Sequence, residues 1–206
     1  DFCLSRGLGD VYKRQVAASA GQADAKCALS RAASKKFTPP FPFFSRMKRL
    51  STSVEGFDKI LNGGLFEGGV YILEGPPGVG KTTLANQIAY TLAKRETRTL
   101  YVTMLAESHS RMLQHMGGQL FFDHQEVNSK VFYVSGYREL EQGGLKSVVA
   151  LLQGELARHR AGLLVIDGLV VGGPVSMSDD SVRQFVHELQ SLVSAMSCTC
   201  PVSYTH

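Results

Sequence analysis

The chain lacks any run of about eighteen apolar residues, and its four cysteines show no paired spacing. A helix needs roughly twenty predominantly apolar residues to cross a bilayer, so we expect no membrane-spanning segment. Cys3, Cys27, Cys198 and Cys200 include no C-x-x-C pair, which argues against a zinc site and against a disulfide framework. These absences favour the reducing cytoplasm as the location of the protein.

An excess of charge of one sign is also missing from most of the chain. Residues 1–46 hold eight Lys and Arg against three Asp and Glu, whereas residues 47–206 hold fourteen against fifteen. The net charge of +4 therefore comes from the first 46 residues. Because non-specific nucleic-acid binding depends on clustered basic side chains, bulk charge gives no reason to expect it in residues 47–206.

Histidines with metal-ligand spacing are missing as well. The histidines at 109, 115, 124, 159 and 187 form no H-x-x-x-H group. We interpret them as surface or capping residues. The length of 206 residues predicts one domain with a substantial core.

A glycine-rich stretch between an apolar run and a helical pattern carries the strongest signal in the sequence. Val70–Leu73 predicts a buried strand, the residues G-P-P-G-V-G-K-T-T follow at 75–83, and helical periodicity begins at Leu84. Glycines let such a loop curl so that successive N–H groups face phosphate oxygens, and the helix start adds further donors. Strand, loop and helix in this order predict a phosphate-binding P-loop.

The residues of this loop have separate predicted roles. We expect Lys81 to contact the β- and γ-phosphates and the Thr82 hydroxyl to bind Mg²⁺. The predicted nucleotide-binding residues are Gly75, Pro76, Pro77, Gly78, Val79, Gly80, Lys81, Thr82 and Thr83. The residues that would contact the base are not identifiable, so the sequence does not choose between ATP and GTP.

Two further apolar runs end in acidic residues. Thr99–Met104 predicts a second strand, and Glu107 follows it. Residues 162–167, G-L-L-V-I-D, have the form of a Walker B strand about 85 residues after the P-loop. An aspartate at the carboxyl end of a buried parallel strand can hold Mg²⁺ through water beside a P-loop. Asp167 is therefore the second predicted Mg²⁺ residue.

The rest of the organised chain continues the alternation of strands and helices. Val131–Ser135 predicts a third strand, and a helix with an apolar face follows it. Ser51 to Ser53 are predicted to cap an early helix, and Asp179 or Asp180 a final one. The pattern then requires another strand, but only Cys198–Cys200 precede the closing residues. We therefore expect this strand, which would be central, to be missing.

The stretch before the P-loop resembles the leader of the RecA/KaiC-type ATPases, L-S-T-G-x-x-x-L-D-x-x-L-G-G-G-L. The matching positions are Leu50, Ser51, Thr52, Asp58, Leu61, Gly63, Gly64 and Leu65. Ser53 stands where glycine is usual in that group. The resemblance covers residues 48–197 and implies an α/β, RecA-like P-loop NTPase fold, here C-terminally truncated, with a mostly parallel sheet flanked by helices.

The same resemblance implies an activity. It implies hydrolysis of ATP with Mg²⁺ at the subunit interfaces of a hexameric ring, with Glu107 and Lys81 as catalytic residues. Glu107 corresponds to the glutamate that polarises the attacking water in this superfamily. A neighbouring subunit normally supplies a basic finger that contributes roughly 10³–10⁵ in rate. In this group the finger follows the strands expected to be missing, so we expect the 206-residue chain to bind ATP and hydrolyse it very slowly.

Two alternative functions stay open. A RecA- or RadA-type recombination ATPase holds DNA with mobile loops that carry basic and aromatic residues. Residues 168–180, the first such loop, contain neither kind and hold two acids. The other alternative is a non-catalytic nucleotide switch that signals through partners. Many relatives have two acids after the second strand, where this chain has Ala106-Glu107.

The two ends of the chain resemble translated sequencing adaptor, at Cys3–Gln15 and Pro201–His206. We therefore expect a disordered or non-native leader over residues 1–46, an incomplete ATPase domain over 47–200, and an adaptor-derived tail over 201–206. Met47 is the candidate start. An organellar transit peptide is an alternative interpretation of residues 1–46, which are rich in Ala, Ser, Lys and Arg and poor in acids.

Overall fold

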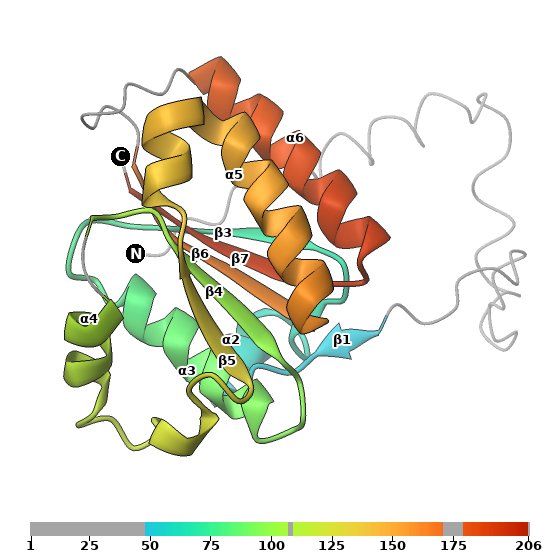
Figure 1. Cartoon of the computed structure of the whole chain (residues 1–206). Helices are drawn as coiled ribbons and strands as arrows, with labels where there is room; N and C mark the ends of the chain where they lie inside the picture. Colours follow the sequence, from blue (N-terminus) through green and yellow to red (C-terminus); the bar gives the residue numbers. More distant parts are fainter. Residues whose placement is uncertain (1–47, 107–108, 171–178, 206) are drawn as a thin grey trace, which may run out of the picture. The chain divides into compact units, whose positions relative to one another are not determined.

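A five-stranded parallel sheet forms the centre of the computed structural model, which describes residues 48–106, 109–170 and 179–205 (Figure 1). Its strands are β3 (Val70–Glu74), β4 (Thr99–Thr103), β5 (Val131–Ser135), β6 (Leu163–Val170) and β7 (Cys200–Thr205). Their order across the sheet is β3-β7-β6-β4-β5, and every neighbouring pair is parallel. This arrangement confirms the predicted α/β fold of RecA-like type.

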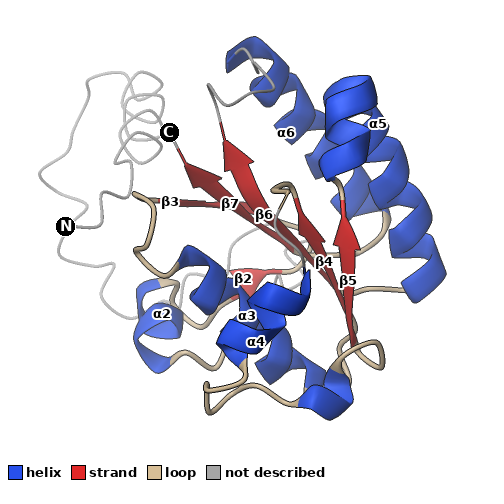
Figure 2. Ribbon diagram, turned by 60° about the vertical axis from the view of Figure 1, so that its left-hand side comes forward, coloured by secondary structure: helices blue, strands red, loops and turns tan. Residues whose placement is uncertain are grey.

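Helices cover both faces of the sheet (Figure 2). They are α3 (Lys81–Ala93) and α4 (His109–Met116) on one face, and α5 (Tyr137–His159) and α6 (Asp179–Ala195) on the other. A short 3-10 helix, η1, spans His124–Glu126. Helix α5 is kinked at Gly144, whose φ of 66° and ψ of −166° are not helical. The sheet is thus the middle of three layers.

Alternation along the strands explains how the sheet fills two separate cores. One core, toward α5 and α6, buries Leu100, Val102, Leu164, Ile166 and Val202. The other, toward α3, buries Tyr101, Val131, Leu163 and Val165. Ala85, Ala89 and Ala93 recur every four residues and are fully buried, so α3 presents a row of small side chains to the sheet. This packing fixes the helix that follows the P-loop.

The expectation of a missing central strand is wrong. Residues 200–205 form β7 between β3 and β6, with Ile72 paired to Val202 and Val202 paired to Ile166. Pro201 argues against a central strand, because proline has no N–H to donate to the ladder. Here the neighbouring Cys200 N–H donates to the Gly69 carbonyl at 2.8 Å, and the strand forms around the proline. The adaptor origin of residues 201–206 stays a prediction.

The leader before the P-loop forms a small ribbon and a short helix. Its elements are β1 (Arg49–Leu50), antiparallel to β2 (Leu65–Phe66), and α2 (Glu55–Ile60). The predicted capping by Ser51 to Ser53 is wrong, because the N-cap of α2 is Val54, without a side-chain cap. The three hydroxyl-bearing residues instead surround Asp58.

Asp58 forms hydrogen bonds with the residues of the turn that precedes α2. Its carboxylate accepts hydrogen bonds from the Ser51 hydroxyl, from the backbone N–H and hydroxyl of Thr52, and from the Ser53 N–H, at 2.6–3.0 Å. Burial alone would raise the pKa of Asp58, but these hydrogen bonds outweigh it and lower that pKa below its usual value. Asp58 of the leader is therefore a structural residue that holds the turn as a carboxylate.

Gly64 and Gly63 allow a stability test of the leader. Both have strongly positive φ, +116° and +110°, so alanine is strained at either position. A Cβ on Gly64 would also overlap the backbone of Leu50 and lie 2.8 Å from Ser51 Cα, whereas a Cβ on Gly63 would meet only Arg49 Cδ at 3.6 Å. We expect Gly64→Ala to lower the free energy of unfolding by about 1–3 kcal/mol more than Gly63→Ala does.

Urea unfolding of the two variants, followed by circular dichroism, measures this difference. Gly56→Ala is the matched control, because a Cβ there meets nothing within 4 Å and the residue lies in α2. Equal destabilisation by Gly64→Ala and Gly63→Ala would show that the backbone overlap relaxes without cost.

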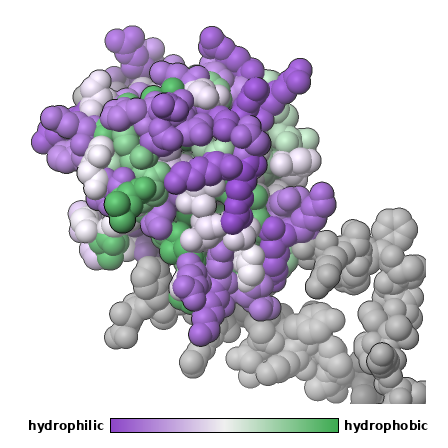
Figure 3. Space-filling model, turned by 90° about the horizontal axis from the view of Figure 1, so that it is seen from below, coloured by the Kyte–Doolittle hydropathy of each residue, from purple (hydrophilic) through white to green (hydrophobic). Residues whose placement is uncertain are grey.

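Among the described residues, no helix is long and apolar enough to cross a membrane. Figure 3 views the molecule from the side on which α3 and α4 lie in Figure 1. This face is mainly hydrophilic, with small apolar areas between the hydrophilic side chains.

Candidate functional site

The predicted P-loop lies between the carboxyl end of β3 and the start of α3. Gly78 and Gly80 have φ of +80° and +95°, which L side chains rarely adopt. Gly80 is also the N-cap of α3 and has no side chain to cap it. The first N–H groups of a helix have no partner within the helix. In the part of the chain that the structure describes, those of Lys81, Thr82 and Thr83 form no other hydrogen bond.

This geometry suits an anion. Open N–H donors, loop glycines with positive φ and the positive end of the helix dipole together favour a phosphate group. The chemistry of the loop residues therefore suits a nucleotide phosphate.

Lys81 lies over the loop that it follows. Its Nζ donates to the Gly75 carbonyl at 2.6 Å and to the Pro76 carbonyl at 2.9 Å. The ammonium group is thus held against the carbonyls at the start of the loop. A phosphate bound there would offer the same group stronger, charged acceptors.

Asp167 lies at the carboxyl edge of the sheet, on the face toward α3. It pairs in register with Thr103 of β4, and it is 7% exposed. The expectation that its strand ends at this residue is wrong, because β6 continues to Val170. Gly168, with φ of +86°, lies at a register shift between Ile166 and Leu169, after which the strand pairs with β7 again.

A chain of buried polar groups, which sequence patterns did not reveal, joins Asp167 to α3. The Tyr101 hydroxyl donates to Asp167 Oδ2 at 2.9 Å and accepts from Asn86 Nδ2 at 3.0 Å. Tyr133 donates to Asn86 Oδ1 at 2.8 Å, and its hydroxyl lies 3.1 Å from that of Tyr90. Strand alternation was the available signal, because Tyr101 and Asp167 point to the same face.

Burial controls the protonation of this chain. Desolvation, followed by the nearby Asp167 carboxylate, raises the pKa of Tyr101 well above its usual value. Tyr101 therefore keeps its proton at every ordinary pH and donates it to the carboxylate. Burial likewise raises the pKa values of Tyr133 and Tyr90.

Glu107, the predicted catalytic base, lies outside the described residues. The chain approaches it from Thr103, and the Met104 N–H donates to the Asp167 carbonyl at 2.8 Å, which keeps the end of β4 beside Asp167. Beyond the gap, His109 Nε2 lies 2.9 Å from the Thr103 hydroxyl. Burial lowers the pKa of His109 below its usual value, so this ring is neutral at pH 7.

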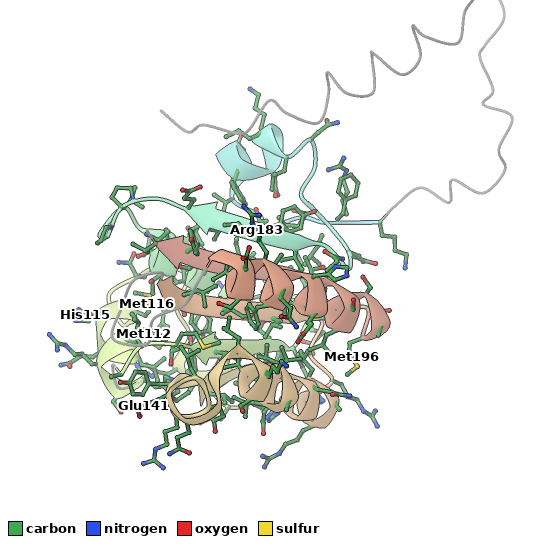
Figure 4. The ribbon with its side chains drawn as sticks, turned by 90° about the horizontal axis from the view of Figure 1, so that it is seen from above. Met112, His115, Met116, Glu141, Arg183 and Met196 are labelled. Atoms are coloured by element: carbon green, nitrogen blue, oxygen red, sulfur yellow. The ribbon has the colours of Figure 1, made fainter. Side chains whose placement is uncertain are left out.

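The histidines differ in their surroundings. His115 is exposed and points away from Met112 and Met116, which α4 buries (Figure 4). His109, in contrast, contacts a buried strand residue, so its interpretation as a surface or capping residue is wrong. Among the described residues, no three His, Cys, Asp or Glu side chains group as a metal site.

The oxygen ligands predicted for Mg²⁺ are the Thr82 hydroxyl and the Asp167 carboxylate. Mg²⁺ in nucleotide sites is usually bound by one or two protein oxygens together with substrate phosphates and waters. A hydroxyl at the P-loop and one nearly buried carboxylate at the sheet edge fit that mode, and they do not fit a cage made of protein ligands alone.

A separate hollow of about 410 Å³ lies on the other face of the sheet. It is between the edge strand β3 and α6, and its wall includes Ile72, Val186, Val202 and Arg183, which Figure 4 labels on α6. Ile72 is 55% exposed there. The hollow is mostly apolar, and no residue from 75 to 83 lines it.

Comparison with known proteins finds similarity over the region of the chain that forms the sheet and its helices. The KaiC ATPase family matches residues 50–201. UPF0273 protein MK0039 of Methanopyrus kandleri is 26% identical over 158 residues, which are 76% of this chain and 55% of that protein.

DNA repair protein RadA of several bacteria is also similar to this chain. The Chlamydia pneumoniae protein is 26% identical over 144 residues, which are 70% of this chain and 29% of that protein. The Helicobacter pylori protein is 42% identical over 55 residues, 27% of this chain and 12% of that protein. This chain spans less than two thirds of the length of each of these three relatives.

Proposed function

Because the chain belongs to the KaiC ATPase family, we propose that it binds Mg²⁺–ATP at residues 75–83 and hydrolyses the γ-phosphate. The observation that carries the proposal is the set of open N–H donors at the start of α3, together with the Lys81 ammonium on the Gly75 and Pro76 carbonyls of the same loop. Asp167, at the carboxyl edge of the same sheet, also supports it.

Each residue has a distinct part in the proposed reaction. The loop N–H groups and Lys81 hold the phosphates and offset negative charge as it develops. The Thr82 hydroxyl and Asp167 are the groups that would hold Mg²⁺, which supplies further neutralisation of the phosphates when bound. Glu107 would orient the attacking water and accept its proton.

The proposed site belongs at the boundary between subunits of a ring-shaped oligomer, by its resemblance to the KaiC group. A basic finger from the neighbouring subunit would then complete the site. We therefore propose that the 206-residue chain binds Mg²⁺–ATP and turns it over slowly.

Thermal unfolding with nucleotides tests the binding step. At an ATP concentration about 100 times the dissociation constant, a ligand that binds only the folded state stabilises it by about 2.7 kcal/mol. We expect the Tm to rise by roughly 5–10 °C with Mg²⁺–ATP, given about 2–4 °C per kcal/mol for a chain of this size.

The matched control is AMP, which lacks the β- and γ-phosphates and should leave the Tm nearly unchanged. GTP in a parallel titration reports base preference. An unchanged Tm with saturating Mg²⁺–ATP would contradict the proposed function.

The similarity to DNA repair protein RadA favours one alternative, a DNA-dependent ATPase. Salt-sensitive, ATP-dependent capture of single-stranded DNA would support that alternative, since phosphate contacts weaken steeply as salt rises.

A further inference from the structure

The polar chain beneath the P-loop connects both residues expected at Mg²⁺. Asn86 Nδ2 donates to the backbone carbonyl of Thr82 at 2.9 Å as well as to the Tyr101 hydroxyl at 3.0 Å. Tyr101 in turn donates to Asp167 Oδ2. Asn86 and Tyr101 are both 0% exposed, so no water competes for these bonds.

The chemistry of the groups fixes the direction of every bond in this chain. A backbone carbonyl can only accept, so the Asn86 atom that faces Thr82 must be the amide nitrogen. The second N–H of that nitrogen points at the Tyr101 oxygen, which must therefore accept from it. The single proton of Tyr101 is then left for the Asp167 carboxylate.

Tyr133 completes the hydrogen bonds of the amide. It donates its proton to Asn86 Oδ1 at 2.8 Å, and a turned amide would set its oxygen against the Thr82 carbonyl and lose that bond. The amide and the phenol are therefore held in one arrangement. Among the described residues, Tyr101 is the hydrogen-bond donor to the Asp167 side chain, and it engages only Oδ2.

We propose that Tyr101 and Asn86 are positioning residues: they hold the Asp167 carboxylate in a fixed orientation toward the Mg²⁺ of a bound nucleotide. This inference rests on the proposed function. It assigns to a buried tyrosine of β4 and a buried asparagine of α3 the task of aligning an oxygen ligand, without any contact of their own with metal or phosphate.

Tyr101→Phe removes one hydroxyl and keeps the ring. Partners that orient a metal-ligating group typically contribute 10–100-fold to metal affinity. We expect the Mg²⁺ concentration at half-saturation to rise about tenfold in the variant, measured by titrating Mg²⁺ against a fixed concentration of N-methylanthraniloyl-ATP and following its fluorescence. Binding of the same analogue in EDTA should stay within about twofold of wild type, because the phosphate-binding loop is untouched.

Tyr90→Phe is the matched control. It makes the same substitution at a fully buried tyrosine of α3, whose hydroxyl contacts only Tyr133 within the described polar chain. We expect it to lower the Tm without moving the Mg²⁺ midpoint. Asn86→Leu should move the midpoint in the same direction as Tyr101→Phe but less, and it carries the test if Tyr101→Phe fails to fold.

The possible outcomes separate this inference from the proposed function. An unchanged Mg²⁺ midpoint in a folded Tyr101→Phe, or an equal shift in Tyr90→Phe, would overturn the positioning role while nucleotide binding stood. An equal weakening of analogue binding in EDTA would also overturn it, since the effect would then not act through the metal. No analogue binding by the wild-type chain in either buffer would overturn the proposed function and this inference with it.

Discussion

Lys81→Ala is expected to weaken binding of N-methylanthraniloyl-ATP by about 100-fold or more. The Lys81 ammonium contacts two carbonyls of the loop in which the β- and γ-phosphates are proposed to bind. Hydrogen bonds to charged groups contribute about 1.5–3 kcal/mol each. Loss of two such bonds exceeds the roughly 2.7 kcal/mol that corresponds to a 100-fold change in affinity.

Lys94→Ala is the control for this experiment. Lys94 is exposed at the C-cap of the same helix, so the substitution removes the same charge from α3 at the end away from the loop. Fluorescence titration of both variants should show near-wild-type affinity for Lys94→Ala only. Similar losses in the two variants would indicate a general effect of charge or stability, and the assignment of Lys81 to the phosphates would fall.

Most strands and helices of the sheet could be predicted because their signals are local. Val131–Ser135 is a strand with the bounds that its β-branched and aromatic residues predicted. The P-loop was recognisable because the loop, its glycines and the helix start are contiguous in sequence. Predicting its elements required no information about residues that are distant in sequence.

Most of the features that sequence patterns did not reveal depend on distant partners. Pro201 weakens the local signal for β7, and only the flanking strands β3 and β6 make a strand there favourable. Asp58 matched a leader motif, but its bonds to the preceding turn follow from the folded backbone. Gly168 gives no local sign that β6 continues beyond Asp167.

The candidate site shows the same division. The sequence predicts residues 75–83 and Asp167 separately, and the parallel sheet explains why both lie at the carboxyl edge. Tyr101 and Asn86 were not identified, because each looks like an ordinary buried residue of a strand or a helix. Their relation appears only when β4, β6 and α3 are packed together.

Glu107→Gln is expected to lower the rate of ATP hydrolysis by about 100-fold or more while leaving nucleotide affinity unchanged. The amide keeps the shape of the side chain but cannot accept a proton from the attacking water. Strand β4 ends four residues before Glu107, at Thr103, which pairs with Asp167. This register directs the chain toward the predicted metal-binding edge and supports the choice of Glu107 over more distant acids.

Single-turnover hydrolysis of radiolabelled ATP, with protein in excess, suits a chain that is expected to react slowly. Glu141→Gln is the control, because Glu141 is exposed on α5, away from the P-loop helix (Figure 4). Equal rates for wild type and Glu107→Gln, with ATP still bound, would favour the nucleotide switch, since binding without a working base leaves ATP as a conformational signal. A selective loss of rate in Glu107→Gln, with affinity unchanged, would support hydrolysis with Glu107 as the base, because an interaction made only in the transition state changes turnover without changing affinity.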